Sequence, residues 1–265
     1  MSKVIKKEDI IMKLNETKLD LDYYIDTQFD LADSKEAEAN SKESAEKSRL
    51  INAKNKILKR INLIVSWFAQ WLEFIKYEKH FNPNNLKRYL YGEIIYVDLG
   101  FNVGKEFGGP HYAIVLNKKD TKSNNVLTIV PLSSLKDKNK DKLGDRLYLG
   151  NEVKKAVGDN LSNNLNKLKA KIDVAIKELA SNKNINQEVF LSKIEYYKKQ
   201  IEHNQLVHKL HEKLKEESIA LTNQITTISK MRIRNPKSPS DSLANIRISK
   251  DTMKTIVQKI HKLYG

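Results

Sequence analysis

The pattern of apolar and polar residues changes twice along the chain. Up to about residue 80, helical periodicity prevails and residues that break a helix are almost absent. In the most apolar stretch, residues 61–75, the polar residues recur at spacings of four, four and three and so form one narrow stripe on a helix. We therefore expect a helix over about 50–77 that is buried on most of its surface. This apolar stretch is too short to span a membrane, which needs about 20 residues.

From residue 91 the pattern becomes that of strands and turns. Short runs of β-branched and aromatic residues alternate with glycine, asparagine and charged residues. We expect strands at 92–99, 112–117, 125–132 and 146–150, with a solvated loop at 136–142. Residues 218–233 are again strand-like, and a helix over 248–264 closes the chain, with Ser249 as its N-cap.

A helical segment interrupts this strand-rich region. Between residues 161 and 179, apolar residues alternate at four- and three-residue spacing, which is the seam of a coiled coil. A turn at 181–187 and a second helix to about 215 complete an antiparallel hairpin. A domain accepts such an insertion at a loop whose ends lie close together. The sequence thus predicts a helical region over 1–85, a strand-rich domain made of 91–150 and 217–265, and an inserted hairpin over 151–216.

Composition and charge narrow the function classes. The net charge of +15 and the pI near 9.6 favour an anionic partner such as RNA, DNA or an acidic protein, although a generally lysine-rich composition gives the same balance. The absence of cysteine excludes disulfides and cysteine-based zinc sites, and the chain lacks a signal-peptide pattern, so we expect a cytoplasmic protein. His203, His208 and His211 lie close together without the spacing of a zinc motif, and we expect neither a metal nor a cofactor.

Five segments, taken in order, resemble the MazF/PemK toxin family. They are GEIIYVDL at 92–99, GKEFGG at 104–109, AIVLN at 113–117, TIVPLSS at 128–134 and the strand-like residues 218–233. The region that carries the resemblance, about residues 91–150 and 217–262, is about 40% of the chain. The resemblance implies an α+β fold: an SH3-like (PemK/MazF/CcdB-type) β-barrel with a C-terminal helix, here joined to an N-terminal helical region and an inserted antiparallel helical hairpin.

The resemblance also implies a function. Members of the family are toxins of toxin-antitoxin systems that cut single-stranded RNA, mainly mRNA, without a metal. They are endoribonucleases that work by 2′-hydroxyl transesterification, form homodimers and are held in check by a cognate antitoxin, with no role for a membrane. Because CcdB-type gyrase poisons share the fold, the fold alone leaves two alternatives open. One is a non-catalytic, CcdB-like topoisomerase inhibitor, and the other is a helical scaffold or binding module with an inactive barrel.

Metal-free RNA cleavage needs a base, an acid and positive charge at the phosphate. In the family, an arginine directly after G-G-x and a hydroxyl residue at the end of the third strand carry the site. The matching positions here are His111 and Ser133. Histidine exchanges protons near neutral pH, whereas arginine keeps its proton. His111 is therefore compatible with acid or base catalysis, but it is a poorer permanent clamp for a phosphate.

The missing positive charge must then come from other residues. Lys105, Arg146 and Arg232 are the candidates for binding phosphate. Ser134 takes the place of Ser133 if the register of the third strand slips by one residue. Glu106 lies in the loop that borders the RNA groove in the family, and we expect it near the RNA.

Overall fold

The computed structural model of the chain describes residues 7–135, 143–181, 187–212 and 216–265. The expected loop at 136–142 and most of the expected turn at 181–187 lie outside these residues. Over the described residues the fold is α+β, with five α-helices and an antiparallel sheet. The chain divides into two compact units, Met1–Lys79 and His80–Gly265. None of the described helices has the length and apolarity needed to cross a membrane.

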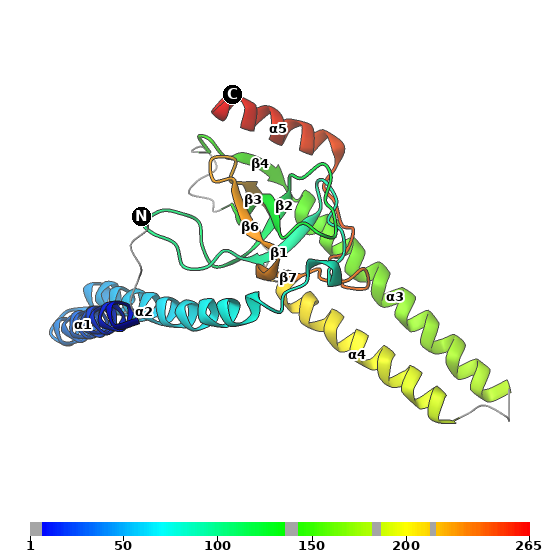
Figure 1. The fold of residues 1–265 in the computed structure, drawn as a ribbon, viewed down its shortest axis with the longest axis horizontal. Helices are drawn as coiled ribbons and strands as arrows, with labels where there is room; N and C mark the ends of the chain where they lie inside the picture. The colour runs from blue at the N-terminus through cyan, green and yellow to red at the C-terminus, as the bar shows by residue number, and fades with distance from the viewer. Residues whose placement is uncertain (1–6, 136–142, 182–186, 213–215) are drawn as a thin grey trace. The chain divides into compact units, whose positions relative to one another are not determined.

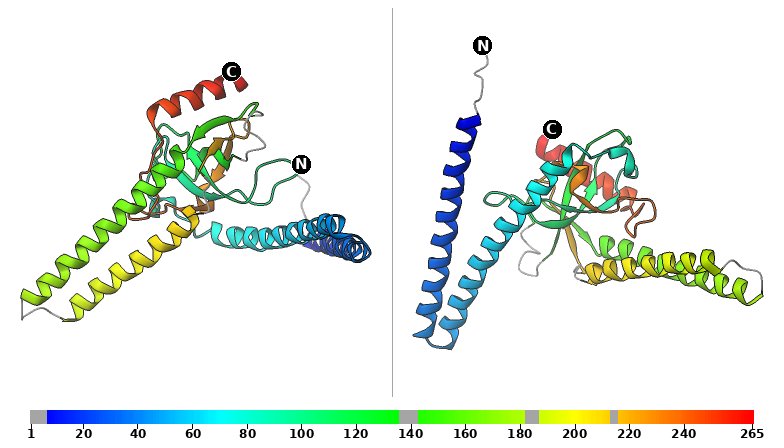
Figure 2. Two further views of the ribbon diagram at one scale, coloured as in Figure 1. Left: turned by 180° about the vertical axis from the view of Figure 1, so that it is seen from behind. Right: turned by 60° about the horizontal axis from the view of Figure 1, so that its bottom comes forward.

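The first unit is an antiparallel pair of helices (Figure 2). The helices are α1, Lys7–Asn40, and α2, Ser44–Glu78, joined by a three-residue turn at 41–43. The least exposed residues of α1 recur every three or four residues and form the seam that faces α2: Leu21, Ile25, Gln28, Ala32, Lys35 and Ala39. On α2 only Ile61 is buried.

The expectation that α2 is buried on most of its surface is wrong. Val65, Phe68, Leu72 and Ile75 are 42–47% exposed. The physical reason is that a pair of helices buries only the seam that the two helices share, and one partner covers one side of α2. The remaining apolar residues of α2 therefore lie on the surface of the first unit.

The second unit is built on a seven-stranded sheet in which all strand pairs are antiparallel (Figure 1). After the short 3-10 helix η1, Pro83–Asn85, the strands are β1 Ile94–Asp98, β2 Pro110–Val115, β3 Val126–Ser134, β4 Leu147–Gly150, β5 Ser218–Ala220, β6 Thr226–Ser229 and β7 Ile233–Asn235. Their order is β4-β5-β3-β2-β1-β7, and β6 pairs with β3. All four expected strands before the hairpin are present within a few residues of their expected bounds.

Five of the strands form a row that bends back toward its own start. In the row β6-β3-β2-β1-β7, the two end strands are consecutive in sequence and are joined by the 3-10 helix η3, Lys230–Arg232. Among the described residues, however, no pairing joins β6 to β7. The sheet is therefore not closed by hydrogen bonds, and the expected SH3-like barrel is not confirmed.

The inserted hairpin consists of α3, Glu152–Ser181, and α4, Gln187–Glu212, which lie side by side (Figures 1 and 2). It is inserted between β4 and β5, which pair directly with each other. The ends of the insertion therefore lie on neighbouring strands. Along the expected seam of α3, Leu161 and Ala175 are buried and Leu165, Leu168 and Ile172 are half-buried.

Each face of the sheet packs against its own apolar core. On one face, Ile94, Ile114 and Val130 pack with residues of α3 and of the C-terminal helix α5, Lys250–Tyr264. Ser249 is confirmed as the N-cap of α5, because its Oγ accepts a hydrogen bond from the backbone N–H of Thr252 at 3.1 Å. On the other face, residues of the bent row form the second core: Ile95, Val97, Ala113, Val115, Leu127, Ile129, Ile228 and Ile233.

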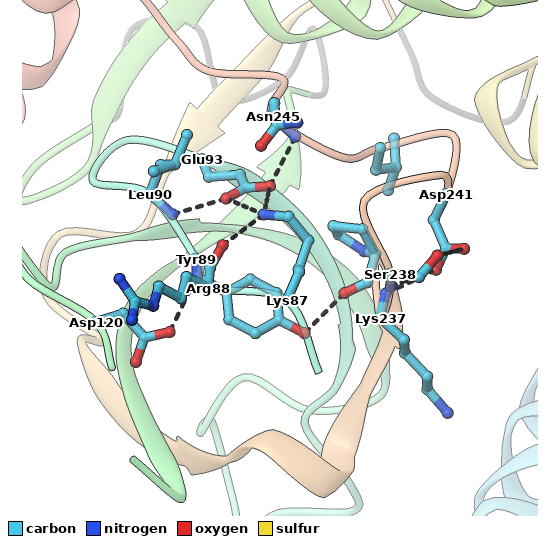
Figure 3. Close-up of polar contacts among 12 residues, drawn as sticks. Lys87, Arg88, Tyr89, Leu90, Glu93, Asp120, Lys237, Ser238, Asp241 and Asn245 are labelled. Atoms are coloured by element: carbon cyan, nitrogen blue, oxygen red, sulfur yellow. Dashed lines mark hydrogen bonds and ion pairs between the residues drawn. The ribbon is translucent and has the colours of Figure 1, made fainter. Parts of the chain in front are cut away.

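Two buried ion pairs fasten the segment before β1 to the rest of the second unit. The Glu93 carboxylate accepts hydrogen bonds from Lys87 Nζ at 2.6 and 2.7 Å and from the backbone N–H groups of Leu90 and Asn245 at 2.7 and 2.8 Å (Figure 3). Lys230 Nζ contacts the Asp120 carboxylate at 2.8 and 2.9 Å, and this carboxylate also accepts a hydrogen bond from the backbone N–H of Tyr89 at 3.0 Å. The side chains of both pairs are almost inaccessible to solvent, so their charges are satisfied inside the protein.

Candidate functional site

The loop between β1 and β2 is held in a narrow shape by backbone contacts at its base. Leu99 N–H donates to the Gly109 carbonyl at 2.9 Å, and Gly109 N–H donates to the Gly100 carbonyl at 2.6 Å. A Cβ at Gly108 would lie 2.5 Å from the Gly100 carbonyl oxygen, so only glycine allows the two sides of the loop to come this close. The loop therefore presents residues 102–107 in a fixed position.

A second segment faces this loop, between β5 and β6. Both strands pair with β3. Two residues of β3 lie between Ile129 and Leu132, whereas five residues lie between their partners Thr226 and Ala220. Three extra residues therefore bulge out of the sheet between β5 and β6. Gln224 in this bulge joins the two segments: its Oε1 accepts a hydrogen bond from Phe107 N–H at 2.7 Å.

A pocket of about 560 Å³ opens between the loop and the bulge. Its apolar part is formed by Leu99, Phe107, Pro131, Ile225 and Ile228. Its polar part is formed by Asn102, Lys105, Glu106, Asn223, Gln224, Thr226 and Arg232. Three of the residues expected to bind RNA, Lys105, Glu106 and Arg232, thus line one pocket although they are far apart in sequence.

Arg232 is positioned by the end of β1. Its Nε donates to the Asp98 carbonyl at 2.8 Å, and partial burial of the guanidinium lowers the pKa of Arg232, while the Asp98 carboxylate acts in the opposite direction. Asp98 is itself buried: its Oδ1 accepts from Gly100 N–H at 3.0 Å and its Oδ2 pairs with Arg234. Asp98 therefore ties both the loop and the Arg232 segment to the edge of the pocket.

His111 lies on β2 beside the pocket. Its ring contacts the ring of Phe107, which lines the pocket, with centroids 4.1 Å apart. Burial lowers the pKa of His111, and a hydrogen bond to the backbone of Gly108 and the charge of Asp98 only partly offset this. His111 is thus mainly neutral at pH 7, the form that accepts a proton.

A comparison with known families covers the strands and the loop that form this pocket. Residues 91–195 match the PemK-like, MazF-like toxins of type II toxin-antitoxin systems. The resemblance expected from the sequence is confirmed for this segment. No curated protein matches the chain.

The match to the PemK-like, MazF-like family has different bounds from the resemblance seen in the sequence. It contains β1 to β4, the whole of α3 and the first residues of α4. The resemblance excluded the hairpin and included 217–262, whereas the matched segment enters the hairpin and ends before β5. The Lys105 and Glu106 side of the pocket therefore lies within the matched segment, and Arg232 lies beyond it.

The two hydroxyl candidates of the family site lie on opposite faces of β3, because successive side chains of a strand alternate. Ser133 pairs with Ile219, which packs in a small apolar cluster with Phe107. Its side chain therefore lies on the same face as Pro131 and the pocket. Ser134 pairs with Ser218 and lies on the other face, with Leu132.

Arg146 lies outside the lining of this pocket. Its backbone N–H and its Nε both donate to the Leu143 carbonyl, at 3.0 and 3.1 Å, in the turn before β4. The side chains of His203, His208 and His211 are outside the described part of the structure. Of the residues that assemble the pocket, sequence reasoning missed Asp98, Asn102, Phe107 and Asn223. Asp98 is the next-to-last residue of GEIIYVDL and the last residue of β1, and a carboxylate at the end of an apolar strand is the signal that was available.

Proposed function

We propose that this protein is the toxin of a toxin-antitoxin system and cleaves single-stranded RNA without a metal. The observation that carries the proposal is the pocket in which Lys105, Glu106 and Arg232 converge beside His111, next to strands that match a toxin family. We include in the proposal that the row β6-β3-β2-β1-β7 forms the SH3-like barrel of that family.

In the proposed reaction, the 2′-oxygen of one nucleotide attacks the adjacent phosphorus and the 5′-oxygen of the next nucleotide leaves. Neutral His111 takes the proton of the 2′-hydroxyl, since burial keeps its pKa low. Lys105 and Arg232 hold the phosphate and balance the charge that develops on its oxygens. Protonated His111 then returns the proton to the 5′-oxygen, which gives a 2′,3′-cyclic phosphate and a free 5′-hydroxyl.

Ser133 and Glu106 have supporting roles in the proposal. Ser133 lies on the pocket face of β3, where its hydroxyl donates a hydrogen bond to a phosphate oxygen. Glu106 lines the pocket and accepts hydrogen bonds from an unpaired base, since carboxylates accept from the amino groups of bases. Ser134 and Arg146 have no part in this site.

The direct test is cleavage of a long unstructured RNA in EDTA, with analysis of the ends. We expect fragments ending in a cyclic phosphate, and His111→Ala and Arg232→Ala should each lower the rate by about 10²-fold or more. His261→Ala is the matched control, because His261 is exposed in the last turn of α5. Equal cleavage by wild type and His111→Ala would refute the assignment, whereas toxicity that survives both substitutions without any RNA cleavage would point to a non-catalytic inhibitor.

We also propose that a cognate antitoxin binds and neutralises this protein. The support is the family match, which is to toxins of type II systems. Co-expression of the reading frame next to this gene is the test. Rescue of growth together with co-purification of the two proteins is the expected result, and toxicity that this reading frame does not relieve would contradict it.

A further inference from the structure

The helical pair α1–α2 leaves one apolar face uncovered. Val65, Phe68, Leu72 and Ile75 follow one another at spacings of three, four and three residues, the spacing of a helix seam. These four side chains are 42–47% exposed, and within the described residues of the first unit only α1 lies beside α2. Apolar side chains gathered in this way on a surface mark an interaction site.

The neighbouring helix carries apolar residues on the same side. Val65, Phe68 and Ile75 each directly follow a half-buried residue of the α1–α2 seam, namely Ile64, Trp67 and Phe74. On α1, Phe29 likewise follows the half-buried Gln28, and Met12 and Leu19 continue its stripe toward the N-terminus. In an antiparallel pair, residues one position after the seam of either helix lie on the same side of the pair. Met12, Leu19 and Phe29 are 59, 68 and 45% exposed, so α1 adds apolar side chains to this face. Asp22, Asp26 and Asp33 directly follow seam residues of α1 in the same way, so this side of α1 is also acidic.

The charges of the two helices are opposite. α1 contains ten acidic and four basic residues, a net charge of −6, and α2 contains seven basic and three acidic residues, a net charge of +4. Within one chain the helices meet along one seam, where Lys54 and Glu36 form an ion pair. A second copy of the pair stacked on the apolar face brings further opposite charges together if α1 lies on α2 of the other copy.

We propose that the α1–α2 pair is a self-association module and that a second copy of this chain covers its apolar face, forming a four-helix bundle. The charges select the arrangement. A two-fold axis parallel to the helices places each α1 on the partner's α2, so every neighbouring pair of helices is antiparallel and oppositely charged. A two-fold axis perpendicular to the helices places α1 on α1 and repeats the same charge across the interface. This module is separate from the segment that matches the toxin family.

Mass measurement on the full chain in solution is the first test. Wild type should have about twice the mass of the 30.6 kDa chain. Phe68→Glu with Leu72→Glu should raise the dissociation constant roughly 100-fold or more, as expected for two central apolar contacts. Asn52→Glu with Ser66→Glu is the matched control: it adds the same charge to two exposed polar positions of the same helix that follow exposed residues instead of seam residues, and it should leave the dimer intact. Because Phe68 and Leu72 are already exposed, circular dichroism should show unchanged helix content in both double variants.

Spin labels give the second test, which does not depend on disruptive substitutions. The chain has no cysteine, so a single cysteine at Ser48 or at Ser66, both exposed on α2, carries one label in each copy. The proposed parallel axis predicts similar label-to-label distances for the two positions. The perpendicular axis predicts a distance that changes by about 3 Å for each residue moved along the helix, twice the helical rise.

Three results would overturn the proposal. A monomeric wild-type chain means that some other partner covers the face. A dimer that survives Phe68→Glu with Leu72→Glu means that the chain associates elsewhere. Label distances that change steeply between Ser48 and Ser66 mean that the proposed packing of α1 on the partner's α2 is wrong.

Discussion

The buried pair Lys87–Glu93 gives the sharpest prediction for the stability of the second unit. Glu93 is completely buried and its carboxylate accepts four hydrogen bonds, two of them from the buried ammonium of Lys87 (Figure 3). Glu93→Gln keeps the shape of the side chain but removes the negative charge and turns one acceptor into a donor. The ammonium of Lys87 then remains buried without its counter-charge.

The expected cost of this change is large. Removing one member of a buried ion pair typically costs about 3–5 kcal/mol, because the remaining charge is neither hydrated nor paired. This is a large part of the total stability of an ordinary domain, about 5–15 kcal/mol. Removing one member of an ion pair on the surface costs far less, about 0–1 kcal/mol. Glu216→Gln is therefore the control, since Glu216 pairs with Lys154 but its side chain is 74% exposed.

Hydrogen exchange is the appropriate assay, because it reports on each unit separately. The only two tryptophans, Trp67 and Trp71, lie in the first unit, so tryptophan fluorescence does not follow the second. For Glu93→Gln, the slowest amides of β1, β2 and β3 should exchange about 10²–10³-fold faster or more, which corresponds to the loss above. Amides of α1 and α2 serve as an internal reference.

Replacing both partners tests whether the unpaired buried charge causes the loss of stability. Lys87→Met with Glu93→Gln removes both charges and keeps an amide oxygen as an acceptor for the backbone N–H groups around it, so it should recover a substantial part of the stability lost in Glu93→Gln alone. If Glu93→Gln costs no more than Glu216→Gln, or if the double variant is less stable than the single one, the buried charge is not what makes this contact important.

Four further predictions concern the site and the C-terminal helix. Because burial lowers the pKa of His111, RNA cleavage should be independent of this residue's protonation at pH 7 and fall only as the pH drops below about 6.5, and an acid limb centred above 6.5 in the pH–rate profile would contradict this. The same shift means that, as the pH falls, His111 takes up a proton in the unfolded chain before it does so in the folded chain. The stability that His111 contributes is therefore complete above about pH 6.5 and decreases toward lower pH, and urea titrations of wild type and His111→Gln should show this difference. Gly108→Ala should destabilise the loop by about 1–3 kcal/mol in thermal unfolding, because its Cβ would lie 2.5 Å from the Gly100 carbonyl oxygen, and an unchanged melting temperature would show that the loop adapts freely. Ser249→Ala should cost about 1 kcal/mol by loss of the N-cap bond to Thr252, seen as faster exchange in the first turn of α5, while Ser249→Asp should restore it.

The sequence by itself determined the local elements of this protein. Short runs of β-branched and aromatic residues between turn residues predicted β1 to β4, and the four- and three-residue spacing predicted α3, because these patterns act within a few residues of chain. The cap at Ser249 was equally readable, since an N-cap is defined by its immediate neighbours. The order of short motifs indicated the family, and the match over residues 91–195 confirms it for that segment.

The candidate site was only partly readable from the sequence. Lys105 and Glu106 were found through the family loop and Arg232 through its charge, and all three line the pocket. No pattern in the sequence indicated that Arg232 lies beside that loop and that Arg146 does not. That choice depends on the bulge between β5 and β6 and on the contact of Arg232 with the Asp98 backbone.

Only the tertiary structure decided which charged residues are buried and which apolar residues are not. Glu93 and Lys87 look like surface residues in the sequence, yet they form a buried pair, because the segments that carry Leu90 and Asn245 meet around the carboxylate. Phe68 and Leu72 look like core residues, yet a pair of helices leaves them exposed. Whether a side chain is buried depends on which distant segments pack around it in the folded protein. A local sequence pattern contains no information about those segments.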